Sequence, residues 1–243
     1  TAGDPYLFDA RNPALSVDIT GTAYLAWENG AGFFSSRPVG GGWSAPAPIL
    51  LWPFRLSRPQ LAVDAGGTAH VAWQAASEGK PNAIAYATFR TALASQPAVV
   101  VTDTAAIDVR RLLIDASGRP HLAWTTSQGS VFHATEIAGG AWTVARLSTP
   151  ASWTNAMVDL APTLTGVWAA WSTEDPAGGF EGGCAKWTSA GGWNSHGGCG
   201  LPWRAAPLLK VLGDRVDLMY LPNSDSALDF FHLSWVDAPI GAS

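Results

Sequence analysis

The amino-acid sequence predicts an all-β protein, a five-bladed β-propeller with four-stranded antiparallel blades. The first observation is a repeated segment, which reads VDITGTAYLAW at 17–27, VDAGGTAHVAW at 63–73 and IDASGRPHLAW at 114–124. Weaker copies end at Trp171 and Tyr220. The second observation is the spacing: the terminal aromatic residues are 46, 51, 47 and 49 residues apart, and the step across the chain ends is 50. Equal steps of this size are typical of propellers and favour a closed ring.

Each of the first three repeats offers four strand-like segments. The expected strands are 14–18, 22–27, 33–37 and 43–50 in the first repeat, 60–64, 68–73, 83–89 and 98–102 in the second, and 111–115, 120–124, 131–137 and 142–148 in the third. Alternation of side-chain type is clearest at 83–89, where a period of two indicates a strand. No segment shows a helical period with caps.

A D-x-x-G step joins the first two strands of each clear repeat. Asp18, Asp64 and Asp115 are expected to accept hydrogen bonds from the turn backbone, and the glycine that follows supplies a positive φ. The tryptophan that ends the second strand is expected to pack between blades. His70 and His121 occupy one repeated position, and we interpret them as packing residues with a polar tip, because blades about 10 Å apart cannot share one metal ion.

The last repeat is one strand short. Its segments 207–212, 215–220 and 227–235 supply three strands, and 4–8 has the right place to supply the fourth. The N-terminal strand would then close the ring by joining the last blade, which removes free sheet edges. We expect one domain, 1–243, with blades at about 13–50, 59–103, 110–148 and 156–200, and a last blade at about 207–235 plus 1–8.

Composition excludes some partners. The net charge is −5, and no run is rich in Lys or Arg, so nucleic acid is not expected. No apolar run reaches the roughly 18 residues of a membrane helix, so membrane insertion is not expected either. No motif for a metal or a cofactor is present, and we expect none. The oligomeric state stays open.

The two cysteines flank a turn at 190–193. Cys184 and Cys199 are equidistant from its centre, so a regular hairpin would place them opposite each other. A disulfide would then indicate an oxidising compartment and a secreted or cell-surface protein. Two free buried thiols are the alternative.

One face of the predicted propeller carries the longer loops. These are the loops from the second strand to the third and from one blade to the next, and binding sites typically lie on such loops. Aromatic rings there offer platforms for the apolar face of a sugar, and planar polar groups bind its hydroxyls. The candidate ligand-binding residues are Tyr6, Arg11, Trp52, Arg55, Arg58, Trp153, Asn155, Trp203 and Arg204. The alternative for each tryptophan is packing between blades.

These Asp-Gly turns, together with the Gly-Gly that precedes Trp43, Trp142 and Trp193, resemble five-bladed lectins of the tachylectin-2 type. The segment 16–21, SVDITG, also resembles the S-x-D-x-G-x-T-W Asp-box of secreted sialidase-like propellers, with one more residue between Asp and Gly. The resemblance covers the whole chain at the level of architecture. It implies sugar binding, and no binding residue is transferred from it.

Three functions remain as hypotheses. The first is a lectin-like module that binds glycans or polysaccharide. The second is a glycoside hydrolase or polysaccharide lyase that uses carboxylates among Asp9, Asp103, Asp108 and Glu174. In that case Arg11, Arg58 and Arg204 could hold a substrate carboxylate. The third is a protein-interaction propeller. The sequence favours binding over catalysis and assigns no catalytic residue.

Overall fold

The computed structural model describes residues 10–49, 54–90, 95, 97–105, 107–137, 140–148, 154–174, 180–196, 199, 205–213, 215–222 and 231–236. These residues form nineteen β-strands, and no helix occurs among them. Within the same ranges, no helical segment could therefore cross a membrane. The chain divides into two compact units, Thr1–Leu112 and Leu113–Ser243, and each is described by itself.

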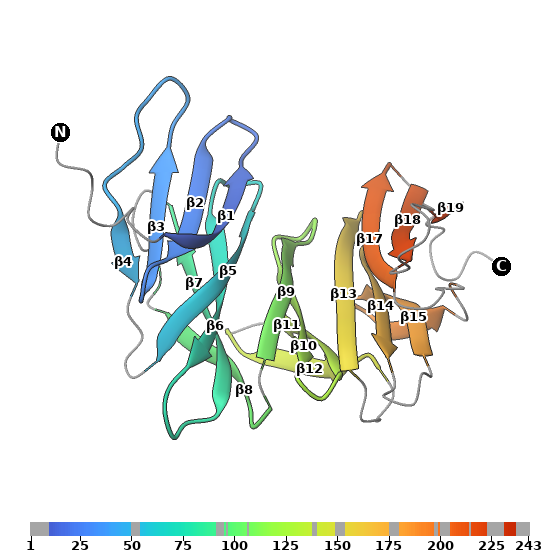
Figure 1. Cartoon of the computed structure of the whole chain (residues 1–243). Helices are drawn as coiled ribbons and strands as arrows, with labels where there is room; N and C mark the ends of the chain where they lie inside the picture. Colours follow the sequence, from blue (N-terminus) through green and yellow to red (C-terminus); the bar gives the residue numbers. More distant parts are fainter. Residues whose placement is uncertain are drawn as a thin grey trace. The chain divides into compact units, whose positions relative to one another are not determined.

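The first unit contains two four-stranded antiparallel sheets (Figure 1). The strands of the first sheet are β1 (Arg11–Val17), β2 (Ala23–Glu28), β3 (Gly32–Arg37) and β4 (Ala47–Ile49). Those of the second sheet are β5 (Arg55–Val63), β6 (Ala69–Ala76), β7 (Asn82–Phe89) and β8 (Ala98–Asp103). The first strands β1 and β5 contact each other. The strand expected from Trp43 begins later, at Ala47, and is correspondingly short.

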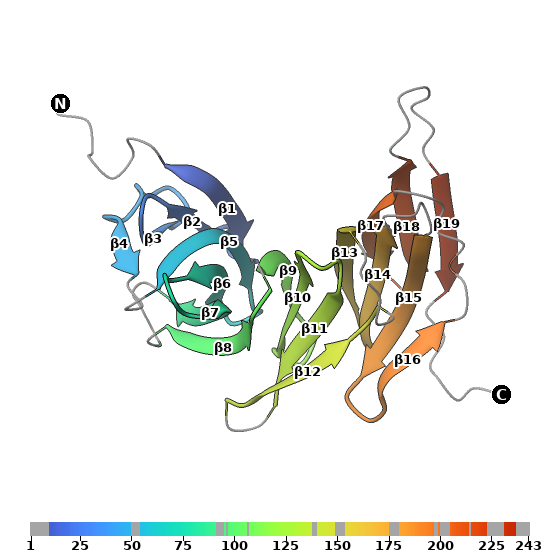
Figure 2. The ribbon, with the colours of Figure 1, turned by 60° about the horizontal axis from the view of Figure 1, so that its bottom comes forward.

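The second unit contains most of the third sheet and all of the fourth and fifth (Figure 2). The strands of the third sheet are β9 (Ile107–Ile114), whose first six residues belong to the first unit, β10 (Pro120–Thr126), β11 (Val131–Glu136) and β12 (Trp142–Arg146). The fourth sheet has β13 (Thr154–Thr163), β14 (Gly166–Glu174), β15 (Phe180–Thr188) and β16 (Gly192–His196). The fifth has β17 (Ala205–Leu212), β18 (Arg215–Pro222) and β19 (Phe231–Val236).

The sheet topology confirms the predicted fold class. All five sheets are antiparallel, and within each the strands lie in chain order, which is the blade pattern of a five-bladed β-propeller. The fifth sheet shows three strands among the described residues, as its sequence predicts. Residues 1–8, expected to supply its fourth strand, lie outside the described part. Closure of the ring and the limits of the single predicted domain therefore stay predictions.

The turns between first and second strands form as their aspartates predict. Asp18 Oδ1 accepts hydrogen bonds from the backbone N–H groups of Thr20 at 2.8 Å and Thr22 at 2.9 Å. Asp64 and Asp115 make the equivalent pair of bonds in the next two sheets. Each turn closes through a glycine at positive φ, for example Gly21 at 86°. One carboxylate oxygen therefore fixes each hairpin, and the other remains available for other contacts.

The cores lie between neighbouring sheets of a unit. In the first unit, Phe34 of the first sheet stacks on Phe89 of the second with ring centroids 4.2 Å apart, beside the fully buried Trp73. In the second unit, apolar side chains of β9–β11 pack on β13–β15, and β13–β15 in turn pack on β17 and β18. The repeated tryptophans Trp27 and Trp124 are also buried, which confirms their structural role.

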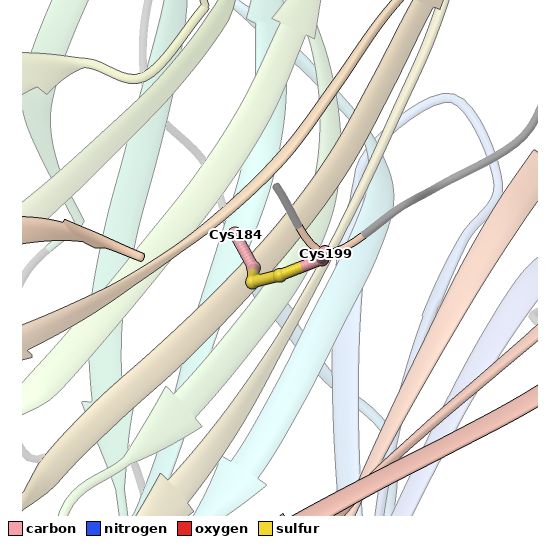
Figure 3. The surroundings of a disulfide bond; sticks show 2 residues. All are labelled: Cys184 and Cys199. Atoms are coloured by element: carbon pink, nitrogen blue, oxygen red, sulfur yellow. A yellow bond between two sulfur atoms is a disulfide. The ribbon is translucent and has the colours of Figure 1, made fainter. Parts of the chain in front are cut away.

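The predicted disulfide joins Cys184 to Cys199 (Figure 3). The expectation that a regular hairpin places these residues opposite each other is wrong, because Cys184 of β15 pairs with His196 of β16. Cys199 lies three residues farther along, beyond the end of β16. The bond therefore ties the chain that leaves the fourth sheet back to the middle of β15.

Candidate functional site: a polar cavity at the first strands

The candidate site starts from a β-bulge that recurs in β1 and β5. The β1–β2 register shifts between Arg11 and Ala14, and the β5–β6 register shifts between Ser57 and Gln60. In each bulge two residues stand opposite the repeated tryptophan of the second strand. The sequence of each bulge places a proline second, so β1 reads Asn-Pro and β5 reads Arg-Pro.

The first residue of each bulge has a strained backbone. Asn12 and Arg58 both have φ at 48°, and they are the non-glycine residues with positive φ among those described. The left-handed region costs an ordinary residue about 1–2 kcal/mol. Asparagine tolerates it better than most, whereas arginine gains nothing from it locally. Such strain persists where surrounding contacts enforce it, and it is concentrated at functional sites.

Glu28, at the end of β2, enforces both strained conformations. Its Oε1 accepts a hydrogen bond from Asn12 Nδ2 at 2.5 Å, and its Oε2 accepts one from the backbone N–H of Arg58 at 3.0 Å. One carboxylate therefore joins the bulge of the first sheet to that of the second. We call Glu28 with Asn12 and Arg58 the bulge clamp.

The side chain of Arg58 is held at its other end by β9. Asp108 Oδ1 lies 3.2 Å from Arg58 Nη1, and Asp108 Oδ2 lies 3.0 Å from Arg110 Nη2. The carboxylate of Asp108 thus stands between two guanidinium groups. The three residues are partly exposed, with side chains exposed at 56% for Arg58, 28% for Asp108 and 33% for Arg110.

These residues surround a cavity of about 340 Å³ in the first unit, here called the first-strand cavity. Its lining residues come from β1, β5 and β9 and are Asn12, Pro13, Arg58, Pro59, Gln60, Asp108, Val109 and Arg110. Among the described residues, the Gln60 side-chain amide has no hydrogen-bond partner. The Nε and Nη2 of Arg58 likewise have none within that part of the chain. The lining therefore offers directed donors and acceptors to a small polar molecule.

A second cavity of about 340 Å³ lies at the opposite ends of β1 and β5. Asp18, Tyr24, Gly67 and Arg90 are among the residues that line it. The Tyr24 hydroxyl lies 3.0 Å from Asp18 Oδ2 and 3.0 Å from the Gly67 carbonyl oxygen. Burial, and then the bond to Asp18, raises the pKa of Tyr24. The polar groups here mainly satisfy the turns and join the two sheets, so this cavity is the weaker candidate.

Three of the predicted binding residues are described in the first unit, and one of them lies at the first-strand cavity. Arg58 lines it, the backbone of Arg11 stands opposite that of Glu28 in the β1–β2 register, and Arg55 begins β5 with an exposed side chain. Asn155 lies in β13 of the second unit, and nothing is described of its side chain. Tyr6, Trp52, Trp153, Trp203 and Arg204 lie outside the described residues, so the predicted aromatic platforms stay predictions.

The carboxylates considered for catalysis separate into different environments. Asp108 lines the cavity. Asp103 Oδ1 accepts the backbone N–H of Ala105 at 2.9 Å, which is turn chemistry. Glu174 is buried at the end of β14, and Asp9 lies outside the described residues. Across the described ranges, no group of three His, Cys, Asp or Glu side chains is arranged to hold a metal ion.

Asn12, Glu28, Gln60 and Arg110 are not among the binding residues predicted from the sequence. A signal for Asn12 was available. Asn12-Pro13 and Arg58-Pro59 are 46 residues apart, which is also the step from Trp27 to Trp73. The repeat therefore marks the two positions as equivalent, but it does not show that their backbone is left-handed.

Buried histidines form a separate polar chain in the second unit. The Trp193 indole donates its N–H to His133 Nδ1 at 3.1 Å, and because indole only donates, that nitrogen must be an acceptor. The proton of neutral His133 is then on Nε2 and points to His121 Nδ1 at 2.9 Å. His121 in turn donates from Nε2 to Asp115 Oδ2 at 3.2 Å. Each histidine therefore fits as the neutral form.

Burial lowers the pKa of both histidines. The pKa of His121 falls to about 4, mainly because burial disfavours the charged ring and despite the opposing effect of Asp115. Burial, and then the neighbouring His121, holds the pKa of His133 well below its usual value. The second sheet has a similar chain, in which Tyr86 hydrogen-bonds His70 and His70 reaches Asp64 at 3.4 Å. Burial lowers the pKa of His70 as well.

Comparison with known proteins finds this architecture in several solved structures. No protein-family profile and no curated protein sequence matches the chain. Among solved structures it is similar to an ulvan lyase of polysaccharide lyase family PL25, with a TM-score of 0.60 and 9% identity over 94% of this chain and 65% of that one. It is equally similar to the lectin BP39L from Burkholderia pseudomallei, with a TM-score of 0.60 and 16% identity over 94% and 67%. A protein of unknown function from Dyadobacter fermentans has a TM-score of 0.57 and 12% identity over 93% and 76%.

The chain thus spans about two thirds of the length of the lyase and of the lectin. At such low identity these similarities show the fold alone. They support the propeller class that the repeats predict. The finer resemblance to tachylectin-type or sialidase-like propellers stays a prediction.

Proposed function

We propose that this protein is a lectin-like module that binds glycans at the first-strand cavity. The observation that carries this proposal is the bulge clamp: two strained residues, equivalent by repeat, are held by one carboxylate so that both line the same polar cavity. Strain of this kind is retained where it positions groups for use. A ring of planar polar side chains suits the hydroxyls of a sugar.

Two further observations support the proposal. One of the similar structures is a lectin, and another is a polysaccharide lyase whose structure holds a saccharide of GlcA and Rha3S. The Cys184–Cys199 disulfide is typical of proteins in oxidising compartments, where extracellular glycans are met. A secreted or cell-surface location therefore accompanies the proposed function.

Catalysis by a glycosidase or lyase is the less favoured candidate. Among the described lining residues, Asp108 alone carries a carboxylate, and it is engaged by two arginines. Hydrolysis of a glycosidic bond uses a pair of carboxyl groups across the scissile bond. The cavity as described therefore favours binding over turnover.

The test is a glycan array followed by titration calorimetry with the best ligand. Gln60→Ala removes a free amide from the cavity and should weaken binding about tenfold. Arg90→Ala, at the second cavity, is the matched control and should bind like the wild type. Loss of binding in Arg90→Ala but not in Gln60→Ala would move the site to the second cavity and contradict the proposal. Binding to a protein partner that free sugars do not compete would favour an interaction propeller instead.

A stability measurement tests the strain on which the proposal rests. Arg58→Gly should raise the free energy of unfolding by about 1 kcal/mol, because glycine has no penalty at positive φ. The same variant should bind glycan more weakly, because the guanidinium is lost. A variant that is less stable than the wild type would show that Arg58 contributes more to folding than its strained backbone costs.

A further inference from the structure

The first strands of the first unit differ in charge from the rest of the chain. The whole protein has a net charge of −5. Yet β1, β5 and β9 together carry five basic residues and one acidic residue, which are Arg11, Arg55, Arg58, Arg110, Arg111 and Asp108. All six lie within the first unit. A local excess of arginine in an acidic protein attracts anions to this edge of the unit.

The guanidinium of Arg58 is not fully used by its counter-ion. Asp108 contacts one terminal nitrogen of Arg58 and one of Arg110. A guanidinium has five N–H donors on a planar fork, so a free edge remains on Arg58. Its Nε and Nη2 have no partner in the described part of the chain, and 56% of its side chain is exposed. That edge has the geometry for two parallel hydrogen bonds to a carboxylate or sulfate.

Arg58 is also held in place before any ligand arrives. Glu28 fixes its backbone N–H, and Asp108 fixes the tip of its side chain. A long side chain that is already ordered loses less conformational entropy when it binds. Asp108 contacts Arg58 through one terminal nitrogen, so the rest of that guanidinium fork stays available to a ligand.

We propose that the first-strand cavity selects saccharides that carry a negative group, either a uronic acid carboxylate or a sulfate ester. This inference rests on the proposed glycan-binding function and names the class of glycan. Arg58 makes the main contact with the anion through its free edge, and Arg110 adds to the positive field. Asp108 is a positioning residue that holds Arg58 in its binding orientation.

The experiment compares an oligogalacturonide tetramer, its carboxyl-reduced neutral counterpart and a sulfated galactan tetramer by calorimetry, next to the glycan array. The wild type should bind at least one anionic tetramer about tenfold or more tightly than the neutral one. Whether the carboxylate or the sulfate tetramer binds better identifies the group. Binding of the anionic ligand should weaken as NaCl rises from 50 to 500 mM, and binding of neutral ligands should not.

Arg58→Gln separates charge from shape, because the amide remains planar and polar. This variant should lose most of the preference for the anionic tetramer and most of the salt dependence. Arg90→Gln is the control and should keep both. Equal affinity of the wild type for charged and neutral tetramers, or binding on the array confined to neutral glycans, would overturn the charge selectivity while leaving glycan binding intact. Absence of binding to any glycan would overturn the proposed function and this inference with it.

Discussion

Acidification should destabilise this protein because its folded state holds buried neutral histidines. The perturbation is a decrease from pH 6.5 to pH 4.5. The groups concerned are the buried histidines, above all His121 and His133. In the hydrogen-bonded series from Trp193 to Asp115, each of these two rings carries one proton and accepts one hydrogen bond. A second proton on His133 would point at the Trp193 N–H, so the folded chain resists protonation.

The magnitude follows from the pKa of His121. Its folded value of about 4 lies below the unfolded value of 6.5. The unfolded chain therefore takes up a proton in this range and the folded chain does not, so the free energy of unfolding falls as the pH falls. One such proton is equivalent to at most about 1.4 kcal/mol per pH unit, and because the unfolded histidine is only half protonated at pH 6.5, His121 alone removes about 2 kcal/mol between pH 6.5 and 4.5.

Three other groups with a shifted pKa act in the same direction or at lower pH. The pKa values of His133 and His70 are lowered too, so these histidines also reduce the free energy of unfolding as the pH falls. The pKa of Asp115 is lowered despite its burial, because the Ser117 hydroxyl, the Arg119 backbone and His121 all donate to it. Its contribution is therefore present above its unfolded value of 3.8 and is lost only at lower pH.

The assay is urea unfolding at half-unit pH steps from 7.0 to 4.5, followed by tryptophan fluorescence and circular dichroism. His121→Gln, which cannot take up a proton, should show a shallower loss of stability, by about 1 kcal/mol per pH unit on average. Leu122→Val in the same strand is the control: it should lower stability by about 1 kcal/mol at every pH and keep the wild-type slope. A flat wild-type profile, or a wild-type slope in His121→Gln, would refute the reasoning.

Three further predictions concern the fold. Reduction of the Cys184–Cys199 disulfide should lower the free energy of unfolding by about 3 kcal/mol, as expected for a cross-link with a sequence separation of 15, and calorimetry with and without reductant measures it. Gly183→Ala should cost about 1–3 kcal/mol in urea unfolding, because its new Cβ would lie 2.5 Å from Trp171 Cζ2; an unchanged midpoint would contradict this. Deletion of 1–8 should lower the melting temperature if these residues complete the last blade, and an unaltered melting curve would count against ring closure.

Much of the fold could be predicted because the repeat encodes it locally. The D-x-x-G step specifies a tight turn by short-range hydrogen bonding, and the described turns at Asp18 and Asp64 form as expected. The tryptophan that ends the second strand marks the core position in sheet after sheet, as with Trp73. Such features depend on a few consecutive residues, so the sequence alone determines them.

The cysteine pairing shows where local reasoning stops. Symmetry about the turn predicts that Cys184 and Cys199 face each other, yet Cys184 pairs with His196 in the sheet. The register of a hairpin depends on the type of its turn and on how the flanking strands pack. The disulfide forms nevertheless, because the chain beyond β16 passes within reach.

The second carboxylate oxygen of Asp115 is another feature that the sequence alone does not predict. The sequence explains why Asp115 accepts from the turn backbone, but not that its other oxygen accepts from His121. The histidine belongs to the next strand, and its orientation depends on His133 and on Trp193 of another sheet. A hydrogen-bonded chain across two sheets has no signature in any single repeat.

The candidate site is harder still to predict from the repeat. Arg58 could be assigned to the binding face, because first strands begin there, but its left-handed backbone could not be foreseen, since arginine has no preference for that conformation. The conformation depends on Glu28, which is 30 residues away and belongs to another sheet. Glu28 holds Arg58 in a backbone conformation that arginine disfavours, and this lowers the stability of the fold. That cost is explained if the guanidinium edge presented to the cavity binds a ligand.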